Sequence, residues 1–91
     1  MTVYVLDSSA VIRYIDSEAG AKRVNAILKE CVDGRAAVCI SALQWGEVAG
    51  NIRSRFGATD QLRILSTILP SEVEIAPITA ERAVLAAELK V

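Results

Sequence analysis

The residues best suited to chemistry are two acids near the starts of predicted helices, Asp7 and Glu47, and two hydroxyls, Ser8 and Ser9, that follow the first acid. Asp7 ends an apolar run that is rich in β-branched residues, and an apolar helical pattern begins directly after it. In α/β proteins the functional site lies where strands end and helices begin. A buried strand needs no charge at its end for stability, so we expect Asp7 to be functional.

Glu47 is the second candidate, because it lies six residues after Ser41, the predicted cap of a helix that follows the second apolar run. Parallel strands end at the same edge of a sheet, so Glu47 should point along this edge toward Asp7. Two converging carboxylates repel each other unless they share a proton or a cation. We therefore expect a divalent ion, and carboxylate oxygens favour Mg²⁺ or Mn²⁺.

Composition excludes several other classes of site. The chain has no histidine, which rules out Ser-His-Asp and Cys-His catalysis and makes a structural zinc site improbable. Cys31 and Cys39 form no CxxC pair and are interpreted as small core residues in a reducing compartment. A net charge of −1 offers no overall attraction for polyanions, so a nucleic acid needs a local patch or metal ions.

Hydrophobic spacing and turn residues predict strands that alternate with helices. The strands are expected at residues 2–6, 36–40 and 72–78. Helices are expected at 9–14, from the cap Ser17 to about Cys31, at 42–56, at 59–69 and from Thr79 onward. Ser41 and Gln44 have the capping-box spacing. Gly34 and Gly57 are expected to end the second and third helices.

This alternation implies right-handed βαβ units and a parallel sheet. We expect an α/β fold, a three-layer sandwich with a central parallel sheet, in one domain over residues 1–91. A three-stranded sheet is thin, and the last helical pattern reaches Val91 without a stop signal, so the domain is expected to be incomplete. With no signal peptide or transmembrane run in sight, a cytoplasmic protein without membrane contact is expected.

The chain resembles the PIN domain family, and specifically its VapC-type toxin ribonucleases. The first motif is an apolar strand that ends in Asp7-Ser8-Ser9. The second is the segment Ile40-Ser41-Ala42-Leu43-Gln44-Trp45-Gly46-Glu47-Val48. Each motif is short, but their occurrence together at this separation is moderately specific. Element order and spacing match over essentially all 91 residues.

The resemblance implies a toxin of a type II toxin–antitoxin system that hydrolyses RNA with Mg²⁺ or Mn²⁺. Asp7 would match the first acidic metal ligand and Glu47 the second, and both would be catalytic. Ser8 or Ser9 would match the hydroxyl that supports the first acid. The implied partners are an RNA substrate, a protein antitoxin and a second copy of the chain.

The departure from the family pattern concerns the remaining acids. PIN domains complete their cluster with Asp residues beyond the helix that begins here at Thr79. Asp60, Glu72, Glu74, Glu81 and Glu88 do not occupy equivalent positions. We therefore expect the 91 residues to correspond to the first two-thirds of a toxin, and to bind metal poorly and cleave little RNA by themselves.

Two other interpretations remain open. A phosphotransfer enzyme of the haloacid dehalogenase kind also has an Asp at its first strand end, but it requires a second Asp where this chain has Ser9. A non-catalytic α/β interaction module would use Asp7 only as a helix cap. Among the cations, Arg53 and Arg55 are interpreted as complements to a helix dipole, and Arg13 as an alternative phosphate contact.

Overall fold

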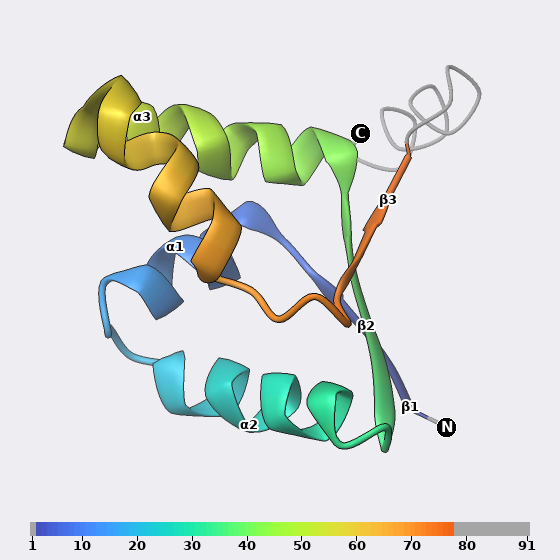
Figure 1. Ribbon diagram of the computed structural model, residues 1–91. Helices are drawn as coiled ribbons and strands as arrows, with labels where there is room; N and C mark the ends of the chain where they lie inside the picture. The colour runs from blue at the N-terminus through green and yellow to red at the C-terminus, as the bar shows by residue number, and fades with distance from the viewer. Residues whose placement is uncertain (1, 78–91) are drawn as a thin grey trace, which may run out of the picture.

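The computed structural model describes residues 2–77, which form three strands and three helices (Figure 1). In chain order these are β1 (Thr2–Leu6), α1 (Ser8–Ile15), α2 (Ala21–Val32), β2 (Ala36–Ser41), α3 (Ala42–Thr67) and β3 (Glu74–Ala76). The helix predicted from Thr79 lies outside the described residues. Within residues 2–77, no helix is long and apolar enough to cross a membrane.

The strands form one parallel sheet in the order β1-β2-β3. The pairing brings Leu6 of β1 opposite Ile40 of β2, and Ser41 of β2 opposite Ala76 of β3. The predicted α/β class and parallel sheet are thereby confirmed. β3 is shorter than predicted: it covers Glu74–Ala76, because a turn in which the Val73 N–H donates to the Pro70 carbonyl precedes it and Pro77 follows it.

All three described helices lie on one face of the sheet (Figure 1). The core forms between them and consists mainly of aliphatic side chains, with Val11 of α1, Ile40 of β2, and Val48 and Ile52 of α3 fully buried. On the opposite face, Val3 and Val5 of β1 are 65% and 74% exposed. The further layer of the predicted sandwich depends on the helix from Thr79, outside the described part of the chain.

The end of α1 corrects one prediction, because Ser17 ends this helix instead of starting the next. The Ser17 N–H donates to the Tyr14 carbonyl and the Glu18 N–H to the Arg13 carbonyl, which is the Schellman arrangement. Ser17 takes the left-handed conformation that this motif requires, with φ of 53°. α2 then begins at Ala21 with Gly20 as its N-cap and no side-chain capping bond.

α2 ends as predicted, at Gly34. Its φ of 75° is left-handed, and the Arg35 N–H donates to the Glu30 carbonyl at 2.9 Å. The same Schellman closure therefore ends both helices, once with glycine and once with serine.

Gly57 interrupts the third helix at the predicted position. The residues on both sides form a single element, α3, which turns at Gly57 where φ is 86° and ψ is 165°. The chain direction changes at this point, so that the second half of α3 folds back toward the sheet (Figure 1). The two helices predicted at 42–56 and 59–69 are thus the two arms of α3.

We expect Gly57→Ala to destabilise the protein by about 1–3 kcal/mol, because this backbone conformation is essentially restricted to glycine. Gly50→Ala is the matched control: Gly50 lies in a regular part of α3, and a Cβ there would meet no atom within 4 Å. It should stabilise the protein by roughly 0.5–1 kcal/mol. Urea unfolding followed by circular dichroism measures both. Equal effects of the two substitutions would contradict the role of Gly57.

Candidate functional site

The sheet register brings the two candidate segments to one edge. Leu6 lies opposite Ile40, so Asp7 follows β1 where Ser41 ends β2. α1 starts from the first position and α3 from the second. The starts of both helices therefore lie side by side at the carboxyl edge of the sheet, as parallel pairing requires.

Asp7 is the N-cap of α1. Its backbone is extended, with φ of −103° and ψ of 170°, and its Oδ1 accepts a hydrogen bond from the Ala10 N–H at 2.7 Å. The residue is exposed. Asp7 therefore does cap α1, and it does so through Oδ1. Its other oxygen, Oδ2, accepts no hydrogen bond from residues 2–77.

Ser8 connects α1 to α3 through two hydrogen bonds. Its hydroxyl donates to Glu47 Oε2 at 2.7 Å, and its backbone N–H donates to Gln44 Oε1 at 2.7 Å. Of the two candidate hydroxyls, Ser8 makes the contact with the second acid, whereas Ser9 is exposed and makes no side-chain hydrogen bond within residues 2–77. Glu47 is thereby held beside Ser8, the residue that directly follows Asp7 in the chain.

Gln44 is the site residue that the sequence did not reveal. Ser41 caps α3 as predicted, because its Oγ accepts from the Gln44 N–H at 3.1 Å. The Gln44 side chain, however, binds the Ser8 N–H instead of completing a capping box. One signal was available: Gln44 and Glu47 are three residues apart, so they lie on the same side of their helix.

The carboxylates at this edge of the sheet supply only part of the ligands that a hard cation such as Mg²⁺ needs. Asp7 and Glu47 are exposed carboxylates, and each has one oxygen in a hydrogen bond with the chain. Carboxylate oxygens of this kind suit Mg²⁺ or Mn²⁺. Within residues 2–77, however, no group of three His, Cys, Asp or Glu residues could hold a metal ion. The described residues therefore offer two ligands at most from acids.

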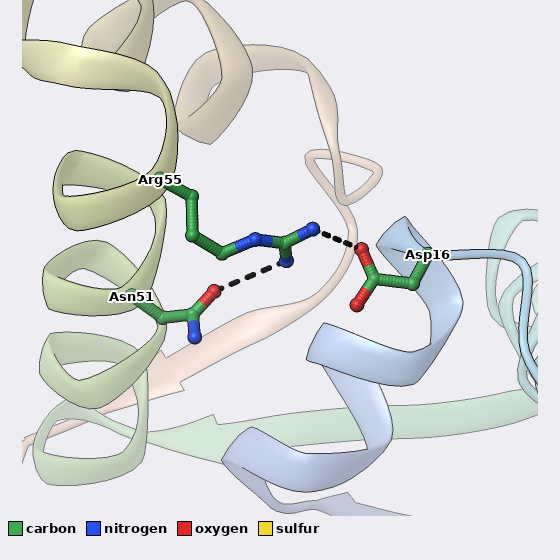
Figure 2. A network of polar contacts seen from close by, with 3 residues as sticks. All are labelled: Asp16, Asn51 and Arg55. Carbon is green, nitrogen blue, oxygen red and sulfur yellow. Dashed lines mark hydrogen bonds and ion pairs between the residues drawn. The ribbon is translucent and has the colours of Figure 1, made fainter.

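The three arginines considered from the sequence differ in their contacts. Arg55 pairs with Asp16 and also donates to Asn51 Oδ1 (Figure 2). It lies in the last turn of the first arm of α3, two residues before the break at Gly57, as predicted. Arg13 and Arg53 are exposed. Arg55 therefore stands near the end of its own helical arm and also joins α3 to the end of α1.

The comparison with protein families gives a match to the PIN domain over residues 4–91, which includes every residue of the site. The chain belongs to the PIN domain family. PIN domains are metal-dependent nucleases as a family. A search of curated proteins finds no match to the chain.

We expect Ser8→Ala to destabilise this PIN domain by about 1 kcal/mol, because the substitution removes a hydrogen bond to a charged acceptor that joins two helices. Ser9→Ala is the matched control and should change the stability by less than about 0.5 kcal/mol. Both are compared in urea unfolding. A larger loss of stability in Ser9→Ala than in Ser8→Ala would contradict the assignment of Ser8 as the residue that connects the two helices.

Proposed function

We propose that this PIN domain is part of a metal-dependent endoribonuclease, the toxin of a type II toxin–antitoxin system. The observation that carries the proposal is the hydrogen bond from the Ser8 hydroxyl to Glu47, which ties the end of β1 to the second turn of α3. Asp7 and Glu47 come from segments 40 residues apart in the sequence, and a stabilising scaffold alone does not require two acids at this position.

In this proposal, Asp7 and Glu47 would hold the Mg²⁺ or Mn²⁺ ion. When bound, such an ion would activate a water and offset the charge that builds up on the scissile phosphate. The Ala10 N–H orients Asp7 by donating to its Oδ1. The Ser8 hydroxyl orients Glu47 by donating to its Oε2. Ser8 therefore supports the second acid instead of the first.

The other two interpretations are distinguished by the same residues. A haloacid-dehalogenase-like enzyme would require an acid or base at position 9, which is an exposed serine here. A non-catalytic interaction module would use Asp7 as a cap and the contact between Ser8 and Glu47 only to join α1 to α3. Such a module should show no metal binding that depends on the two carboxylates.

We expect Asp7→Asn and Glu47→Gln each to weaken Mn²⁺ binding at least tenfold, because each removes one of two charged ligands. Each should also lower RNA cleavage by about 100-fold or more. Both substitutions should leave the stability nearly unchanged, because asparagine also caps helices and the glutamine carbonyl still accepts from Ser8. Electron paramagnetic resonance of free Mn²⁺ and cleavage of a single-stranded RNA measure the two effects.

Glu74→Gln is the matched control for this experiment. Glu74 is an exposed acid on β3 and takes no part in the site, so its substitution should leave metal binding and cleavage at the parent level. If Glu47→Gln cleaves RNA at the parent rate, Glu47 has no catalytic role. Mn²⁺ binding that is equally strong in Asp7→Asn would exclude Asp7 as a ligand.

We also propose that α3 carries the surface for the protein antitoxin and a second copy of the chain. The support is apolar exposure: Leu43 is 52% exposed, Phe56 42% and Leu62 74%. Large apolar side chains exposed on one helical element are candidates for a surface that a partner covers.

We expect the protein to be a dimer in solution and Leu62→Glu to make it a monomer, because a charge cannot be buried in an apolar interface without a partner. Ser66→Glu, an exposed position on the same arm of α3, is the control and should leave the dimer intact. Light scattering coupled to size-exclusion chromatography measures the molar mass. A dimer that survives Leu62→Glu would place the interface elsewhere.

A further inference from the structure

We propose that Arg55 is a positioning residue: through its ion pair with Asp16 it fixes the far end of α1 on α3, and so holds Ser8 against Glu47 and Gln44 at the other end. The inference rests on the proposed function only for its effect on metal binding. Its structural part concerns contacts between two helices and can be tested without metal.

The first observation is the matching spacing of two contacts. Ser8 and Glu47 are 39 residues apart in the sequence, and so are Asp16 and Arg55. The two contacts therefore lie eight residues apart on both helices, which is about 12 Å at the usual helical rise. The helices run in the same direction in register, and polar contacts join them at both ends.

The core between the two contacts is apolar and closely packed. Val11 of α1 and Val48 and Ile52 of α3 are fully buried there, at 0% exposure. Apolar contacts of this kind favour close approach but are not directional. The polar contacts at the two ends can therefore determine how α1 is rotated and shifted along α3, and α1 carries Ser8 on its first residue.

The second observation is the environment of Arg55. Its guanidinium donates to Asp16 Oδ1 at 2.5 Å and to Asn51 Oδ1 at 3.3 Å (Figure 2). It also lies 5.0 Å from the centre of the Phe56 ring. Asn51 is one turn before Arg55 on α3 and directs the guanidinium toward α1. Three contacts thus hold a side chain that is otherwise among the most mobile in proteins.

Among the ion pairs of residues 2–77, this one differs in burial and in what it joins. The Arg55 and Asp16 side chains are 36% and 24% exposed, against 64% and 58% for Arg35 and Asp33. Arg63 and Asp60, at 68% and 50%, lie within α3. Arg55 and Asp16 belong to different elements, and their lower exposure reduces screening by water and salt.

The third observation is that Asp16 is unfavourable for its own helix. It is the C-cap of α1, where the helix dipole places negative charge and where acids are destabilising. Its value to the fold therefore comes from its partner on α3. Arg55 supplies the positive charge that offsets both the carboxylate and the end of the dipole.

The test uses Arg55→Gln, Asp16→Asn and the double variant, with Arg63→Gln as the matched control. The first readout is amide hydrogen exchange at Ser8, whose N–H binds Gln44, measured by nuclear magnetic resonance with the Val48 and Ile52 amides as internal references. We expect each single substitution to accelerate exchange at Ser8 about threefold, as for the loss of a partly exposed ion pair, and to leave the α3 amides unchanged. Arg63→Gln should change neither.

The second readout is Mn²⁺ affinity, which should fall about threefold in Arg55→Gln and Asp16→Asn. The double variant should lose no more than either single variant, because both residues act through one contact. Additive losses, or parent-like exchange at Ser8 in Arg55→Gln, would overturn the proposal. If the parent protein binds no Mn²⁺, the proposed function fails, and hydrogen exchange still decides whether Arg55 positions Ser8.

Discussion

The site depends on the parallel pairing of β1 with β2. Because Leu6 lies opposite Ile40, the two strands end level with each other, and the chain leaves both toward the same side of the sheet. A shift of the register by two residues would move Asp7 and the start of α3 apart by about 7 Å. The contacts of Ser8 with Gln44 and Glu47 exist only in the observed register.

Much of this arrangement could be predicted from local sequence signals. The β-branched run before Asp7 and the capping serine at position 41 mark where two elements begin and end, and both predictions are confirmed to within about a residue. Gly34 and Gly57 could be predicted because positive φ is nearly reserved for glycine. The position of Asp7 directly after β1 could be predicted in the same way, while its role as a metal ligand stays a prediction.

Other features depend on contacts that no local pattern encodes. Ser17 has the residue type of an N-cap, yet the return of the chain from α1 to α2 places it in the left-handed position that glycine usually occupies. Gln44 fits a capping box, yet a backbone N–H 36 residues earlier competes successfully for its side chain. Arg55 lies near the end of its helical arm as predicted, but its contact with Asp16 could not be predicted from that position. For Gln44, a tertiary contact outweighs a local preference worth about 1 kcal/mol.

The exposure of Asp7 and Glu47 explains how the chain can hold two acids together before any ion binds. Two charges 4 Å apart in water repel by only about 1 kcal/mol, whereas a hydrogen bond to a charged acceptor contributes roughly 1.5–3 kcal/mol. The capping bond to Asp7 and the Ser8 bond to Glu47 can therefore outweigh the repulsion without a cation. In the proposed site, an ion would meet carboxylates that are already oriented, so less of its binding free energy would be lost in ordering them. This differs from structural zinc sites, in which the metal itself drives folding.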